Sequence, residues 1–169
     1  MILEAAPDLG TQVSRLRHTL ARWSLSDAGA HAEIRRGRPG DLGTPALWRL
    51  LVTCDIDPQG EAATAGWALL AWALATLGGP ESRQSLGQVL HASGLSELRL
   101  VRLLRADRSQ LTDALRAGIR QVTAKRGNAD ALQLARLLLT DPDGEAGEQI
   151  RRQIARDYYR AALKPQKEV

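Results

Sequence analysis

The side chains that most often carry out catalysis or bind metals are few and scattered in this chain. The three histidines, His18, His31 and His91, form no pair at metal-ligand spacing with each other or with Cys54, the single cysteine. No glycine-rich phosphate loop, dinucleotide fingerprint or nucleophile elbow occurs. We therefore expect no metal, no cofactor and no enzymatic activity. A small helical enzyme with an unrecognised site is a weaker alternative, because catalytic residues can assemble in space from distant positions.

Arginine dominates the charged side chains. Of the 23 cations 20 are Arg, the formal net charge is +4, and the sequence pI is near 9.8. The planar, permanently charged guanidinium suits phosphate, whereas Lys is the more usual residue of a merely solvated surface. A GC-rich genome also favours Arg and Ala, so the clustering of the arginines says more about function than their number.

The basic residues are concentrated in two places. Between residues 99 and 126, eight cations stand against two acids, a net charge of +6 over 28 residues. Within this stretch Arg116 and Arg120 are four apart and share a helix face. A solvated helix face is the plain interpretation, but the clustering favours binding to a phosphate backbone. A second, smaller cluster consists of Arg35, Arg36 and Arg38.

The composition and the apolar spacing predict that helices carry these residues. Leu and Ala dominate, Phe is absent and β-branched residues are scarce, which excludes an all-β fold and disfavours a βαβ enzyme. Apolar residues recur three and four apart, as in the stripe of Val13, Leu16, Leu20 and Trp23. Such runs lie between capping residues, for example Ser85 and Ser96, and Gly or Pro stops, for example Gly94. We expect eight or nine helices, at about 11–23, 31–36, from Pro45, from Pro58 to Leu77, 85–91, 96–106, 109–125, 131–139 and 147–163.

The helices are expected to form an all-α protein of two small helical bundles, residues 1–80 and 81–169. The break Gly78-Gly79-Pro80 divides them, and the net charge changes from −1 before it to +5 after it. The most apolar run, residues 62–77, is shorter than the ~20 residues of a membrane span, and the N-terminus lacks a secretory pattern. We expect a soluble, cytoplasmic protein with no membrane partner.

Two groups of apolar residues are expected in the core. One is the apolar face of the helix at 96–106, formed by Leu98, Val101, Leu103 and Leu104. The other is the set of four tryptophans, which lie on apolar faces and are expected to pack rather than to stack on bases: Trp23, Trp48, Trp67 and Trp72.

Three strings of the sequence resemble a known family. HAEIRRGRPGDLGTPALWRLL, SLGQVLHASGLSELRLVRLLRADRSQL and ARDYYRA are similar in order and spacing to the small subunit of the type I-E CRISPR Cascade complex, the CasB family. The matched parts span about His31 to Ala161, and the string RLLRADR is the most specific of them.

The resemblance implies a fold, an activity and a set of partners. It implies an all-α protein of two helical bundles that is not an enzyme and forms a head-to-tail homodimer within the complex. The implied partners are the other Cascade subunits (the crRNA-bearing backbone and the large subunit), single- and double-stranded DNA, and the crRNA–DNA heteroduplex region. The implied function is to stabilise the R-loop and the displaced non-target DNA strand.

Six arginines are candidate nucleic-acid-binding residues: Arg35, Arg36, Arg105, Arg108, Arg116 and Arg120. The first two match the family's paired arginine, Arg105 and Arg108 match the arginines that flank its Ala-Asp, and Arg116 falls where the family commonly has a basic residue. Arg120 is added because it shares a face with Arg116. A buried pair between Arg108 and Asp107 that braces the fold is one alternative. The chief alternative for the whole protein is a helical protein–protein adaptor whose basic surface binds acidic partners.

Overall fold

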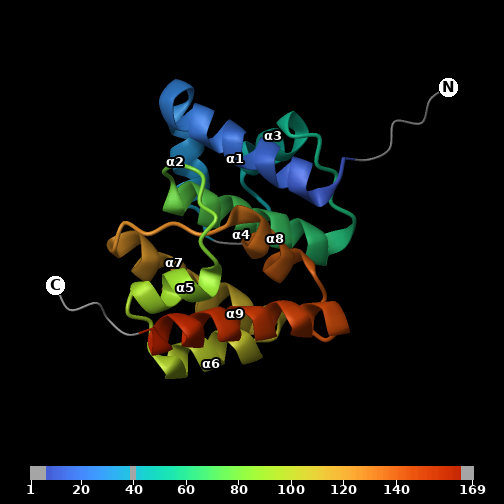
Figure 1. The fold of residues 1–169 in the computed structure, drawn as a ribbon. Coiled ribbons are helices and arrows are strands. Elements are labelled where there is room, and N and C mark those ends of the chain that lie inside the picture. The colour runs from blue at the N-terminus through green and yellow to red at the C-terminus, as the bar shows by residue number, and fades with distance from the viewer. Residues whose placement is uncertain (1–6, 39–40, 165–169) are drawn as a thin grey trace. The chain divides into compact units, whose positions relative to one another are not determined.

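The computed structural model describes residues 7–38 and 41–164, which form helices joined by short turns (Figure 1). This part of the chain contains nine helices and no strand, so the predicted all-α class is confirmed. The chain separates into two compact units, Met1–Ala75 and Thr76–Val169. The glycine-proline break lies just beyond this division. That the two units are separate bundles with a boundary at residue 80 stays a prediction.

The first unit is built from four helices: α1 (Leu9–Ser26), α2 (Ala28–Arg36), α3 (Pro45–Thr53) and α4 (Gly60–Leu77), whose last residues cross the division. The side chain of Asp8 caps α1 by accepting a hydrogen bond from the Thr11 amide at 3.2 Å. α1 buries the predicted stripe, which consists of Val13, Leu16, Leu20 and Trp23.

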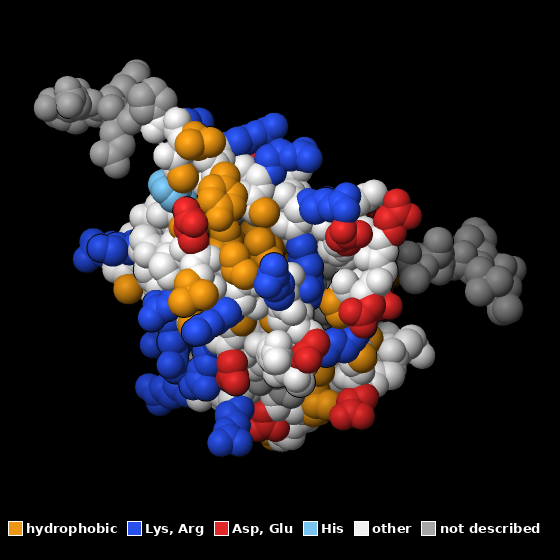
Figure 2. Space-filling model, turned by 90° about the horizontal axis from the view of Figure 1, so that it is seen from below, with side chains coloured by type: hydrophobic (Ala, Val, Ile, Leu, Met, Phe, Trp, Pro, Cys, Tyr) orange, Lys and Arg blue, Asp and Glu red, His pale blue; other side chains and the backbone are white. Residues whose placement is uncertain are grey.

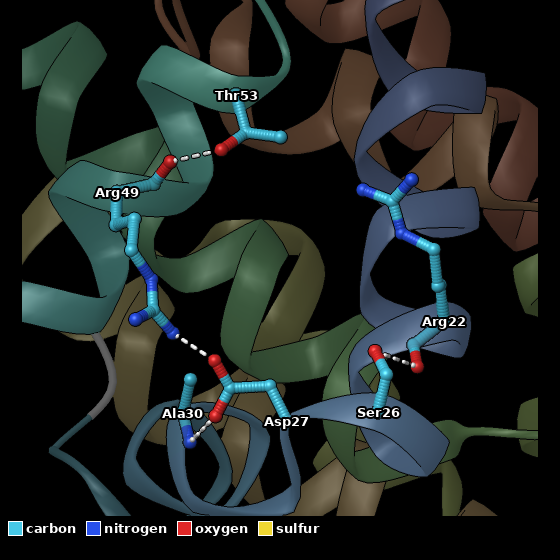
Figure 3. A network of polar contacts seen from close by, with 6 residues as sticks. All are labelled: Arg22, Ser26, Asp27, Ala30, Arg49 and Thr53. Atoms are coloured by element: carbon cyan, nitrogen blue, oxygen red, sulfur yellow. Dashed lines mark hydrogen bonds and ion pairs between the residues drawn. The ribbon is translucent and has the colours of Figure 1, made fainter.

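Asp27 joins two helices of this unit, α2 and α3, through its two carboxylate oxygens (Figure 3). Its Oδ1 caps α2 by accepting from the Ala30 amide at 3.1 Å, and its Oδ2 accepts from the guanidinium of Arg49 on α3. The same guanidinium lies 4.7 Å from the centre of the Trp23 ring on α1, a cation–π contact. Arg49 is therefore committed to the fold, and it is not among the arginines available to a ligand.

The middle of α4 is buried all round. Every residue from Gly66 to Ala75 is buried, as is typical of a core helix rather than an amphipathic surface helix. The predicted start at Pro58 is wrong, because α4 begins at Gly60, whose φ of 85° lies in the left-handed region that favours glycine. Among the described residues no helix is both long and apolar enough to cross a membrane.

Three of the four tryptophans are buried as predicted: Trp23, Trp67 and Trp72. Trp48 is different, because 44% of it is exposed. Its indole Nε1 donates to the Leu42 carbonyl at 2.7 Å, which fixes the ring at the surface of the unit. The expectation of a core position for Trp48 is therefore wrong.

The second unit contains five helices: α5 (Leu86–Ala92), α6 (Glu97–Arg105), α7 (Arg108–Ala124), α8 (Ala131–Leu139) and α9 (Glu145–Leu163). Side-chain caps start four of them, and the caps at Ser85 and Ser96 are those that the sequence predicts. α8 has the predicted bounds. Asn128 ties the segment before α8 to the start of the unit, donating to the carbonyls of Gly78 at 3.0 Å and Pro80 at 2.6 Å.

α5 and α9 approach each other closely because a glycine lies between them. A Cβ on Gly87 would be 2.1 Å from the Ile154 carbonyl oxygen and 2.7 Å from the Tyr158 amide nitrogen. Tyr158 is buried, and its hydroxyl donates to the Leu95 carbonyl at the start of the turn into α6. This contact fixes α9 against the segment that positions α6.

Candidate nucleic-acid interface

Arg105 and Arg108 lie on either side of the turn between α6 and α7. Arg105 is the last residue of α6 and Arg108 is the first residue of α7, and both are exposed. Between them Ala106 is buried and Asp107 is the N-cap of α7. The turn therefore holds two arginines at the surface by burying one residue and using the next as a cap.

Asp107 is occupied by its capping role. Its Oδ1 accepts from the Ser109 hydroxyl at 2.6 Å and from the Gln110 amide at 2.9 Å. These two hydrogen bonds, the Ser109 contact first, hold the pKa of the Asp107 carboxyl below its usual value, so it is ionised at neutral pH.

Arg108 pairs with a different acid. Its guanidinium lies 4.0 Å from Asp141 Oδ1, and half of its side chain is exposed. The alternative of a buried Arg108–Asp107 pair that braces the fold is therefore wrong. An exposed pair at 4.0 Å contributes little to stability, so Arg108 can exchange this partner for a phosphate at small cost.

Arg108, Arg116 and Arg120 lie on one side of α7. With an advance of about 100° per residue, Arg116 is about 80° around the helix from Arg108, and Arg120 is about 40° further. The three span about 18 Å along the axis, which is about the rise of five nucleotides of one DNA strand. Arg120 is exposed and Arg116 is half-buried, with its Nε buried and unpaired among the described residues.

Arg35 and Arg36 lie in the first unit, in the last turn of α2, and both are exposed. Cations at this end of a helix are stabilised by the helix dipole. His31, one turn earlier on α2, is partly buried, and burial first and the charge of Arg35 second lower the pKa of its imidazole.

The structure adds a groove that the sequence does not predict, and its lining includes one candidate arginine, Arg105. α6 and α7 enclose a half-open groove of about 730 Å³, and three arginines of α6 line it: Arg99, Arg102 and Arg105. Leu98 also lines this groove and is 62% exposed, so the prediction that it belongs to the core is wrong. The buried leucines of α6 are Leu103, as predicted, and Leu100, which is outside the predicted face. Figure 2 views the molecule from the side where α6 lies, and shows apolar side chains beside gathered Lys and Arg.

No cluster suited to a metal ion occurs among residues 7–38 and 41–164. Cys54 is buried, its thiol donates to the Thr19 hydroxyl at 3.5 Å, and burial raises its pKa. The thiol is therefore a packed, protonated group rather than a nucleophile.

Two solved structures share this fold. One is the crystal structure of a CRISPR-associated protein of the Cse2 family from Thermus thermophilus, with a TM-score of 0.70 and 23% identity, over 88% of this chain and 98% of that one. The other is the crystal structure of M. ruber CasB, with a TM-score of 0.67 and 22% identity, over 88% of this chain and 95% of that one. No curated protein matches the sequence.

The model of the family described as CRISPR-associated protein Cse2 matches residues 30–159, which is most of the chain and nearly the span of the three strings quoted above. The resemblance to the CasB family is thereby confirmed. The chain belongs to the Cse2 family of CRISPR-associated proteins.

Proposed function

We propose that this protein is a non-catalytic small subunit of the type I-E Cascade complex that binds nucleic-acid backbone and so stabilises the R-loop and the displaced non-target strand. The observation that carries the proposal is the row of arginines along one side of α7, with Arg105 beside its start. Within the complex it would contact the other Cascade subunits and a second copy of itself.

The cations of this row are free to meet phosphates. Four ion pairs join described residues, and of the six candidate arginines only Arg108 takes part in one, at 4.0 Å. Guanidinium groups that already hold a carboxylate would have to give it up before binding. Arg105, Arg116 and Arg120 have no such partner to lose among the described residues.

Backbone contact without base readout fits the role. Phosphate contacts position nucleic acid without selecting a sequence. In an R-loop the guide RNA carries the sequence information by base pairing, and the protein has only to hold the displaced strand. We assign Arg35 and Arg36 to the same kind of contact, from the first unit.

The test is the salt dependence of DNA binding by the purified protein. If three to five arginines contact a single strand, log K falls with log salt at a slope of about −2 to −3.5, from ~0.7 per phosphate. Fluorescence anisotropy of a labelled single-stranded oligonucleotide measures this slope. Affinities for oligonucleotides of unrelated sequence should agree closely.

A charge-reversed variant and a matched control locate the site. Arg116→Glu with Arg120→Glu should weaken binding and reduce the magnitude of the slope by about 1.4, since two phosphate contacts are lost. Arg83→Glu with Arg136→Glu is the control, because it changes the net charge by the same amount at exposed positions outside α6 and α7. The slope of log K against log salt for this control should stay close to that of the unaltered protein. A slope near zero for the unaltered protein, or equal losses in both variants, would refute the proposal.

A further inference from the structure

The groove between α6 and α7 is partly open and has an apolar floor. Its floor consists of aliphatic residues from both helices and from the turn before α6: Leu95, Leu98, Val101, Ala114 and Ala117. Of these residues Leu98 is 62% exposed, whereas Leu95 is buried. An exposed leucine that lines a concave surface, rather than standing singly on a convex one, is typical of a binding site.

The two edges of the groove differ in charge. Along the α6 edge lie Arg99, Arg102 and Arg105, whereas the α7 edge carries Gln110 and Asp113. Arg99 is held by Gln121, to which its Nη1 donates at 3.2 Å. Arg102 and Arg105 form no ion pair with any described residue. The groove is therefore cationic on one edge and weakly anionic on the other.

We propose that this groove docks an amphipathic helix of a partner protein that presents acidic residues to the α6 edge. The aliphatic floor would receive a stripe of aliphatic side chains, and Arg102 would pair with the acids beside that stripe. Asp113 on the opposite edge sets the orientation, because it favours a lysine or arginine of the bound helix there and repels an acid. The lining runs from Leu95 along α6 to Arg105, about 15 Å, which is the length of about ten helical residues and allows anchors at i, i+3 or i+4, and i+7.

The same features disfavour a nucleic-acid strand as the occupant. No aromatic ring lines the groove, so bases would find no platform to stack on. A polyanion carries the same charge throughout, and would bring phosphates toward Asp113 as well as toward the arginines. A helix can place opposite charges on its two sides, and it matches both edges.

Two of the residues that carry this inference are separate from those of the proposed function. Leu98 and Arg102 are not among the six candidate nucleic-acid-binding residues, whereas Arg105 belongs to both surfaces. The experiment therefore changes Leu98 and Arg102 and leaves Arg105 in place.

The probe is a labelled synthetic helical peptide with leucines at i, i+3 and i+7, glutamates along one side of this stripe and lysines along the other. Fluorescence anisotropy with the full chain should show saturable binding. Leu98→Glu should weaken it about tenfold or more, because a carboxylate would replace an apolar anchor on the floor. Leu163→Glu is the matched control, since Leu163 is 82% exposed at the end of α9 and does not line the groove.

A charge exchange tests the edge directly. Arg102→Glu should weaken binding of the glutamate peptide. A second peptide, with lysine in place of the glutamates that face Arg102, should bind this variant but not the unaltered protein. Thermal unfolding and circular dichroism confirm that each variant is folded, and the charge exchange remains informative even if Leu98→Glu lowers stability. The absence of saturable peptide binding would overturn the proposal. So would a loss of oligonucleotide binding in Leu98→Glu as large as its loss of peptide binding, which would make the groove a nucleic-acid site.

Discussion

Gly87 is the residue on which the packing of α5 against α9 depends. Gly87→Ala should destabilise the second unit by about 1–3 kcal/mol or more, because the new methyl group would meet backbone atoms of α9 that cannot move aside singly. Thermal or urea unfolding measures the loss. Gly29→Ala on α2 is the control, since its Cβ would be 3.9 Å from the nearest atom, and alanine is the better helix former. If the two variants unfold alike, α5 and α9 do not pack as described.

His31 reports the local charge at Arg35. Burial and, to a smaller extent, Arg35 lower the pKa of His31 below the ordinary 6.5. NMR titration of the imidazole should therefore give a pKa below 6.5 that rises in Arg35→Gln but stays lowered, because burial is the larger cause. Arg36→Gln is the control and should leave this pKa in place, since Arg36 is not among its causes.

The sign of the pH dependence follows from the same lowered pKa of His31. The unfolded chain takes up the proton more readily than the folded one. Well above pH 6.5, where His31 is neutral in both states, it therefore does not lower the free energy of unfolding. Its destabilising contribution grows as pH falls through 6.5 toward the folded pKa and is constant below it.

The pKa of His31 also tests the assignment of Arg35 to phosphate binding. Phosphate bound at Arg35 would raise the pKa of His31, and the same NMR titration with a DNA oligonucleotide measures this change.

At the scale of the helix, Arg151 secures the end of α6. From α9 its guanidinium donates to the carbonyls of Leu104 and Ala106, both at 2.7 Å, where the helix leaves carbonyls without partners. Arg151→Gln should reduce the free energy of unfolding by about 1.5–3 kcal/mol, the range for hydrogen bonds that involve a charged group. Arg152→Gln is the matched control, because Arg152 only pairs with Glu148 at the surface and the expected loss is about 0.3–0.5 kcal/mol. Equal losses in urea unfolding would show that the Arg151 contacts add nothing.

The ends of the helices could be predicted where a local signal sets them. Ser85, Ser96 and the glycine stop after α5 act within one turn, and they correctly predicted where helices begin and end. Asp57-Pro58 resembles the same kind of start, but Asp57 accepts from the side chain of Gln59 and α4 begins two residues later. A start signal thus predicts that a helix is near, and competing side-chain contacts decide its first residue.

The inward face of α6 could not be predicted from its own sequence. Leucines and valine occupy most of its circumference, so several stripes fit the helical spacing equally well. Arg151 fixes the end of α6 from α9, and Tyr158 of α9 holds the turn before it; both contacts join residues more than 40 positions apart. These contacts orient α6 so that Leu98 and Arg102 face outward beside α7. The shared face of Arg116 and Arg120, in contrast, follows from their spacing along one helix. The sequence therefore finds this pair, but it places Arg108 before the helix and finds neither the full row nor the groove.

For the whole molecule, the location of the charge matters more than its total. The net charge of +4 is modest, yet residues 81–169 carry +5 and residues 1–80 carry −1. A protein that neutralises only a few phosphates binds weakly and sensitively to salt on its own. We therefore expect its effect on DNA to be clear in the assembled complex, where other subunits hold the strand near this surface and raise its local concentration.

The decisive test in the complex is charge reversal at the turn between α6 and α7. Arg105→Glu with Arg108→Glu should lower R-loop yield and the protection of the displaced strand, while guide–target pairing stays possible because base pairing carries the sequence information. Both side chains are exposed, and the helix dipole favours glutamate at the first position of α7 while it disfavours glutamate at the last position of α6. The two effects oppose each other, so the variant should fold and assemble. Arg151 and Arg152, flanked by acids in the sequence, are unsuitable as a control because Arg151 supports α6. Arg83→Glu with Arg136→Glu serves instead, since both are exposed and form no ion pair among the described residues.

Melting temperature, incorporation into the complex and R-loop yield are measured on the same preparations of the Arg105/Arg108 variant and its control. A variant that is stable, assembles and forms R-loops as well as the control would remove Arg105 and Arg108 from the binding surface.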